Sequence, residues 1–171
     1  MDIVVLVLRL LHIFGGIFWV GASFMLVGFI SPAVQASGQV GGQVMQRLMT
    51  GSRFSSIFGL SAMVTMLAGV LLYWRVSGGL QLAWITTAPG LALTIGSLAG
   101  IAAGVIGGGV AGRTGEKIGQ LNAQLGHNQG APSEAQLSEL QGLQQKMKRA
   151  QRLSVGLMII AVVGMAIARY L

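Results

Sequence analysis

The stretch that decides the fold is IVVLVLRLLHIFGGIFWVGASFMLVGFI, residues 3–30, in which Arg9 is the only charged residue. No further charged residue occurs before Arg47. A helix needs about 20 predominantly apolar residues to cross the hydrocarbon core of a bilayer, and this stretch is long enough. Ser31 and Pro32 follow directly, and proline is unfavourable inside a helix. We therefore expect a membrane-spanning helix over residues 3–30.

Three further stretches have the same character. The sequence predicts spans over residues 54–74, 88–112 and 152–171. The third is expected to start at Thr87-Ala88-Pro89, since threonine caps helices and proline fits the first helical turn. Only 9% of the residues are charged, against about 25% in a soluble domain. The predicted fold is therefore all-α: one integral membrane domain over residues 1–171, built as an antiparallel four-helix transmembrane bundle.

Basic residues are distributed unequally between the two sides of this bundle. Arg75 and Arg169 lie on the side of the termini, which also carries the aromatic residues Tyr73, Trp74, Trp84 and Tyr170. The first and third connections hold Arg47, Arg53, Arg113, Lys117, Lys146, Lys148, Arg149 and Arg152. Because cytoplasmic loops are rich in Lys and Arg, we expect both termini outside, on the periplasmic side of the inner membrane. The formal charge of +7 then indicates contact with the lipid bilayer, not with nucleic acid.

The third connection, residues 113–151, has the pattern of two helices and a turn. The apolar residues at helical spacing are Ile118, Leu121 and Leu125, and then Leu137, Leu140, Leu143 and Met147. Between them lie turn-forming residues 126–132, followed by Ser133 as a helix N-cap. We expect spans three and four to continue as a cytoplasmic helical hairpin, the alternative being two loose interfacial helices. A shorter amphipathic helix is expected in the first connection, with one side formed by Val44, Met45, Leu48 and Met49.

Small residues recur at every fourth position of the third span: Gly96, Gly100, Gly104, Gly108 and Gly112. Such a row presents a ridge without side chains, and another helix can approach it closely. Shorter rows of small residues on the second and fourth spans are plausible partners: Ser61, Thr65, Gly69, and Gly156, Gly164, Ala168. The ridge is interpreted as packing within the monomer, or else as the interface of a homodimer or of a larger membrane complex.

The first span carries the candidate site. Arg9, His12, Gly16, Trp19 and Ser23 follow three- and four-residue spacings, so they share one helix face. Polar residues within a span normally face the protein interior or a cavity, and Gly16 is expected to leave a hollow between His12 and Trp19. A neutral His12 imidazole could be the metal ligand of haem b, with Arg9 pairing a propionate and Trp19 lining the site. The alternative is a structural histidine bonded to a neighbouring helix.

The chain offers no second intramembrane histidine, because its other histidine, His127, lies in the third connection. The remaining coordination schemes are a five-coordinate iron, a methionine such as Met63 or Met66, or two His12 residues meeting across a dimer. Met63 and Met66 could also bind copper, although methionines at helical spacing usually fill cores.

Leu11-His12 and Trp19-Val20-Gly21 resemble the first-helix signature of the CopD-like four-helix membrane proteins. The same segment is similar to the first helix of the HemJ-type protoporphyrinogen oxidases, in which a histidine precedes a tryptophan by seven residues. The resemblance implies a haem or copper connection at His12. The HemJ-type proteins resemble one another in a lysine on the third helix, which none of the predicted spans contains.

Catalytic groups are scarce in the apolar stretches. The four acidic residues lie outside the predicted spans: Asp2, Glu116, Glu134 and Glu139. This argues against an ion-coupled transporter, and no nucleophile has a base at a readable spacing. The residues therefore predict no reaction. The leading hypothesis is haem b binding at His12 with a redox or haem-handling role. The alternatives are a non-catalytic membrane subunit that docks partners through the glycine ridge and the hairpin, and copper or small-molecule passage.

Overall fold

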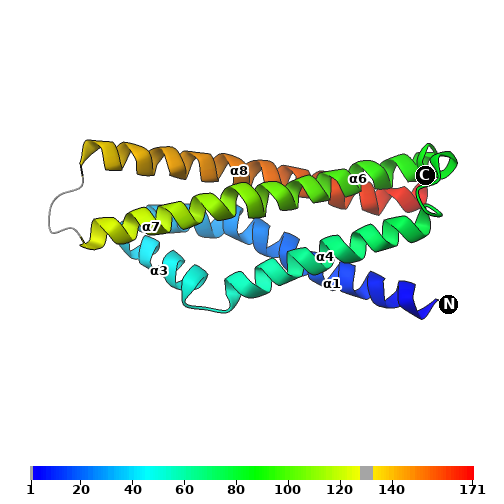
Figure 1. Ribbon diagram of the computed structural model, residues 1–171, viewed down its shortest axis with the longest axis horizontal. Helices are drawn as coiled ribbons and strands as arrows, with labels where there is room; N and C mark the ends of the chain where they lie inside the picture. The colour runs from blue at the N-terminus through cyan, green and yellow to red at the C-terminus, as the bar shows by residue number, and fades with distance from the viewer. Residues whose placement is uncertain (1, 128–132) are drawn as a thin grey trace.

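The computed structural model describes residues 2–127 and 133–171, and the described residues form helices, turns and short connections without a β-strand (Figure 1). The long helical segments are α1 (Ile3–Met25), α4 (Phe54–Val76), α6 (Ala88–Gly104) with η2 (Val105–Gly112) and α7 (Arg113–His127), and α8 (Glu134–Ile167). The short elements are η1 (Leu26–Ile30), α2 (Ser31–Ala36), α3 (Gly38–Thr50), α5 (Leu82–Ile85) and η3 (Ala168–Tyr170). The all-α prediction is confirmed.

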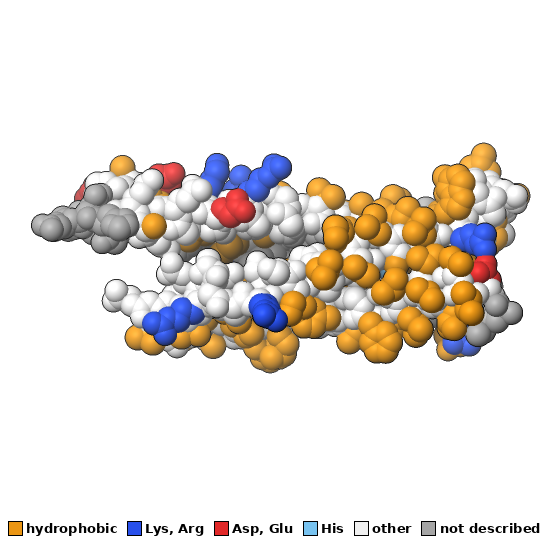
Figure 2. Space-filling model, turned by 60° about the horizontal axis from the view of Figure 1, so that its bottom comes forward, with side chains coloured by type: hydrophobic (Ala, Val, Ile, Leu, Met, Phe, Trp, Pro, Cys, Tyr) orange, Lys and Arg blue, Asp and Glu red, His pale blue; other side chains and the backbone are white. Residues whose placement is uncertain are grey.

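Four helical segments are long and apolar enough to cross a membrane: Ile3–Ala36, Phe54–Val76, Ala88–Leu125 and Glu134–Tyr170. Both chain termini lie at one end of the molecule, and α3 and α7 lie toward the other (Figure 1). Hydrophobic side chains gather over the end that carries the termini, whereas most of the Lys and Arg side chains seen in this view lie in the other half (Figure 2). The four spanning segments that the sequence predicts are therefore present.

The first long helix does not stop at Ser31-Pro32. Its backbone passes through the π-helical turn η1, and α2 then carries Pro32 in its first turn and continues to Ala36. The π turn bonds the Ser31 amide to the Leu26 carbonyl, five residues back. A proline lacks an amide hydrogen and crowds the preceding turn, and a wider π turn accommodates that.

The long helices pack as two pairs, α1 with α4 and α6 with α8. The pairs meet at a core cluster in which Trp19 of α1 is 6% exposed, Ala103 of α6 is 0% exposed and Met158 of α8 is 3% exposed. The Ser154 hydroxyl, also buried, donates a hydrogen bond of 2.8 Å to the Ala103 carbonyl and links α8 to α6. A large aromatic ring against an alanine thus sets the junction between the two pairs.

The α6 and α8 backbones approach closely where two glycines meet. A Cβ atom placed on Gly164 would lie 2.9 Å from the Ala92 carbonyl oxygen and 3.2 Å from the Gly96 Cα. One placed on Gly96 would lie 3.2 Å from the Ala161 carbonyl oxygen. Because lipid offers no hydrophobic drive for association, this side-chain-free contact gives the van der Waals attraction that holds the pair.

The glycine row of the third span does not face one partner. Gly100 lies beside Ala161 of α8, whereas Gly104 faces Met66 and Trp19, and a Cβ on Gly108 would meet nothing within 4 Å. An α-helix has 3.6 residues per turn, so residues spaced four apart are each rotated slightly further around the helix axis. The glycine row therefore winds around the helix instead of running straight. The π-helical segment η2, which contains Gly108 and Gly112, changes the winding again.

The connection between spans three and four is a pair of adjacent helices, α7 and the first part of α8 (Figure 1). Leu121 of α7 is buried, and Leu140, Leu143 and Met147 of α8 are half-buried. Ser133 caps α8 as expected: its hydroxyl accepts from the Gln136 amide at 3.3 Å, and the Gln136 side chain accepts from the Ser133 amide at 3.0 Å. The expected turn at 126–132 falls largely outside the described residues. In the first connection, α3 half-buries Met45, Leu48 and Met49 but leaves Val44 exposed.

We expect Gly164→Ala to lower the stability of the bundle by about 1–3 kcal/mol, because the added methyl group would press against α6 backbone atoms that have little room to move. Gly156→Ala on the same helix is the matched control, since a Cβ there meets nothing within 4 Å. Unfolding of both variants in detergent, followed by circular dichroism, measures the difference. Equal stability of the two variants would contradict the close α6–α8 contact.

Asp2 joins the start of α1 to the end of α4. Its carboxylate accepts from the Val4 amide at 3.0 Å and pairs with the Arg75 guanidinium. The hydrogen bond from Arg75, with help from the Val4 amide, holds the pKa of Asp2 below its usual value of 3.8. A lowered folded-state pKa means that the unfolded chain binds the proton first as pH falls.

The stabilisation from Asp2 should therefore be complete above its usual pKa and be lost as pH falls toward the lowered value. Both side chains are largely exposed, so the expected effect is small. When the free energy of unfolding is measured as a function of pH, Asp2→Asn should lack the loss of stability that protonation of Asp2 causes in the wild type. An unchanged titration in Asp2→Asn would show that the ion pair does not link the two helices.

Candidate functional site

His12 of α1 faces α4 and is half-buried. Its Nδ1 lies 2.8 Å from the main-chain carbonyl oxygen of Thr65. A carbonyl oxygen can only accept, so Nδ1 carries the hydrogen and donates it, and in the neutral ring the lone pair lies on Nε2. The bond therefore sets both the orientation and the tautomer of the imidazole.

Gly69 is the reason that the ring can reach the α4 backbone. In an α-helix the Thr65 carbonyl points toward the amide of Gly69, four residues on, and any side chain there would cover it. A Cβ on Gly69 would lie 2.8 Å from His12 Cε1 and 3.0 Å from His12 Nδ1. The absence of a side chain at Gly69 thus opens the carbonyl to a second donor from α1.

The hollow that the sequence predicts beside Gly16 is filled in the structure. The Thr65 side chain occupies it: a Cβ on Gly15 would lie 2.6 Å from Thr65 Oγ1, and one on Gly16 would lie 3.6 Å from Thr65 Cγ2. The Thr65 hydroxyl donates to the Ser61 carbonyl at 2.7 Å, which turns it along its own helix. Because Gly15 and Gly16 let α4 approach α1, the small residues produce a close contact instead of a cavity.

Trp19 belongs to the core junction and does not lie beside the imidazole. A Cβ on Gly104 would lie 3.5 Å from Trp19 Cη2 and 2.5 Å from Met66 Sδ, so both side chains fill the space next to that glycine. The Ser23 hydroxyl donates to the Trp19 carbonyl at 2.8 Å. His12 and Trp19 lie on α1 as expected, but they have different neighbours: His12 contacts Thr65 of α4, and Trp19 lies beside Gly104.

Arg9 lies on the surface of α1, one turn from His12 on the side of the chain termini. Across residues 2–127 and 133–171 the one ion pair joins Asp2 and Arg75, so Arg9 pairs with no described carboxylate. The structure thus brings His12 together with Thr65 and Gly69, leaves Arg9 free at the surface and places Trp19 in the core.

The chain supplies few further metal ligands near this point. Among the described residues, no three His, Cys, Asp or Glu side chains gather in one group. Met63 is 50% exposed, whereas Met66 packs against Gly104. The two methionines that could bind copper therefore have different surroundings, and they do not form a built site.

Thr65 and Gly69 are the site residues that the sequence did not assign. Both appear in the small-residue row of the second span, which the sequence relates to helix packing and not to His12. The usable signal was that small residues four apart leave a helix carbonyl accessible, so a histidine on the neighbouring span can bond to it. The pairing of α1 with α4 decides that the histidine of the first span lies beside this carbonyl.

Gly69→Ala should destabilise the bundle by about 1–3 kcal/mol, because its methyl group would displace the His12 ring from the Thr65 carbonyl. In a His12→Ala background the same change should have little effect, since the ring is gone. A double-mutant cycle of unfolding free energies measures this coupling. Gly59→Ala, at a site with open space, is the control. Strict additivity of the two changes would contradict the contact.

Comparison of the chain with protein-family models, with curated proteins and with solved structures gave no match. The CopD-like or HemJ-like grouping stays a prediction. What can be said of the site comes from the hydrogen bond of His12 and from the packing of the helices around it.

Proposed function

We propose that the protein is a multi-pass membrane protein that binds haem b through Nε2 of His12. The observation that carries the proposal is the hydrogen bond from His12 Nδ1 to the Thr65 carbonyl. Histidines that ligate metals commonly donate their other ring nitrogen to a carbonyl or carboxylate, which fixes the tautomer and raises the donor strength of the ligating nitrogen. This bond prepares His12 for that role.

The accessibility of Nε2 supports the same role. No hydrogen bond involves Nε2, and no buried side-chain nitrogen or oxygen of the described residues lacks a partner. Nε2 is therefore not fully buried, and its lone pair is available to a ligand.

His12 would offer a haem iron a single ligand. A groove of about 290 Å³ lies between α1 and α4, lined by residues that include Gly15 and Ser61 but not His12. One donor is compatible with a five-coordinate iron or with a His12 pair across a homodimer. Exposed Arg9, one turn away, suits a propionate. Haem would supply one-electron chemistry, His12 would hold its iron, and the Thr65 carbonyl would orient His12.

We propose an antiparallel arrangement with both termini in the periplasm and the α7–α8 hairpin in the cytoplasm. The support is the separation of side chains on the surface, with Lys and Arg concentrated at the hairpin half (Figure 2). A further support is the aromatic contact between Tyr73 and Trp84, with ring centroids 5.8 Å apart, at the end where the termini lie. Aromatic side chains of this kind are enriched at membrane interfaces.

A second candidate function is a non-catalytic membrane subunit that docks a partner through its hairpin half. The observation in its favour is that α3 leaves Val40 and Val44 68% and 58% exposed at that end of the molecule. In this case the bond from His12 to Thr65 is an interhelical lock, and Nε2 binds nothing.

An absorption spectrum separates the two candidates. The purified chain, supplemented with haem in detergent, should develop a shifted Soret band that is lost in His12→Ala. Added imidazole should restore the band in His12→Ala, because it replaces the ligand without replacing the interhelical bond. His127→Ala, which changes the other histidine of the chain, is the control and should leave the band unchanged.

Colourless wild-type protein after haem addition would overturn the proposal and leave the interhelical lock. A Soret band that persists in a folded His12→Ala chain would also overturn it, since the iron would then have another ligand. Circular dichroism of each variant reports whether the helices remain folded.

A further inference from the structure

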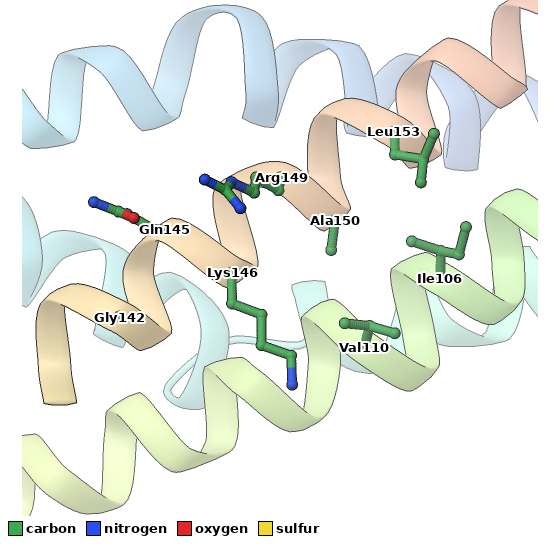
Figure 3. A pocket seen from close by; sticks show the side chains of 8 residues that line it. All are labelled: Ile106, Val110, Gly142, Gln145, Lys146, Arg149, Ala150 and Leu153. Atoms are coloured by element: carbon green, nitrogen blue, oxygen red, sulfur yellow. The ribbon is translucent and has the colours of Figure 1, made fainter.

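A groove of about 400 Å³ lies between η2 and α8, where the uncharged part of each span ends. Figure 3 shows its lining: Ile106, Val110, Gly142, Gln145, Lys146, Arg149, Ala150 and Leu153. Seen along α8, Leu153 and Ala150 come from the spanning part, and Arg149, Lys146 and Gln145 follow toward the hairpin. The groove is therefore apolar at one end and cationic at the other.

The cationic end is not neutralised by the protein. None of the eight lining residues is acidic. Of the ion pairs within residues 2–127 and 133–171, the single one joins Asp2 and Arg75 at the opposite end of the molecule. Lys146 extends from α8 toward η2, beside Val110 (Figure 3). Figure 3 shows Gln145 and Arg149 leaving α8 on the other side from Lys146, so Lys146 is the cation that reaches across the groove and offers hydrogen-bond donors to an anion from outside the chain.

A glycine lies in the wall of the groove. A Cβ on Gly142 would meet nothing within 4 Å. Because Gly142 lines the groove, a larger side chain at this position would enter the groove without touching the backbone of a neighbouring helix. The volume of the groove can therefore be changed without changing its charge.

We propose that this groove binds one anionic phospholipid, with its phosphate at Lys146 and an acyl chain along Ile106 and Leu153. The order of apolar and cationic residues along α8 matches a lipid whose headgroup lies at the basic membrane surface. A soluble anion would use only the cationic end, and a zwitterionic lipid would lose the net attraction. The proposal rests on the spanning segments and is independent of haem binding at His12.

Native mass spectrometry of the full chain in detergent tests the site. Phosphatidylglycerol and phosphatidylcholine are added at equal concentration, and their adducts are counted. Wild type should retain phosphatidylglycerol preferentially. Lys146→Gln should weaken that retention about fivefold, since one basic group near an anionic surface contributes roughly that factor in affinity. Lys148→Gln removes the same charge from a side chain that does not line the groove, and should retain most of the preference.

A second variant tests the space and not the charge. Gly142→Leu should reduce adducts of phosphatidylglycerol several-fold while all basic residues remain. Glycerol phosphate, the soluble headgroup without acyl chains, should fail to displace the lipid. Equal loss of preference in Lys146→Gln and Lys148→Gln would overturn the proposal in favour of a diffuse basic surface. Displacement by glycerol phosphate, or unchanged retention in Gly142→Leu, would overturn the lipid groove itself.

Discussion

Backbone amides and carbonyls inside hydrocarbon have no water to bond, so each must find its partner within the protein. This constraint makes every apolar stretch of the chain helical. It also leaves association of the helices to close packing, because lipid is as apolar as the side chains. The contact of Gly164 with Ala92 and Gly96 and the junction of Trp19 with Ala103 are the consequences. The polar contacts of the bundle add to this close packing and do not replace it.

The bond between His12 and Thr65 follows from the same constraint. A carbonyl already used by its own helix can accept a second hydrogen bond when no side chain covers it, and Gly69 provides that opening. The His12 ring thereby has a hydrogen-bond partner at Nδ1, and its Nε2 stays available. A structural lock and a ligand are thus not exclusive roles for this histidine, since the first prepares the second.

The two proposed sites lie between different helices. His12 lies in α1 and contacts Thr65 of α4, whereas Lys146 and Arg149 line the groove between η2 and α8 (Figure 3). The α8 helix runs unbroken from Glu134 to Ile167 and connects the basic region with the core at Met158. A lipid bound at the groove would therefore hold a helix that also packs against Trp19.

From the sequence alone one can predict the helices, the number of spanning segments, the cap at Ser133 and the helix face that carries His12. These depend on local spacing and on the dominance of hydrophobicity, which a chain shows without its neighbours. Helix pairing decided the rest, because it determines which side chain fills which space. It placed Thr65 in the hollow expected beside Gly16, separated Trp19 from His12, and distributed the glycine row over several neighbours. The π-helical turns before Pro32 and through Gly108 were not predicted either, because the spacing of apolar residues does not distinguish a π turn from an α-helical one.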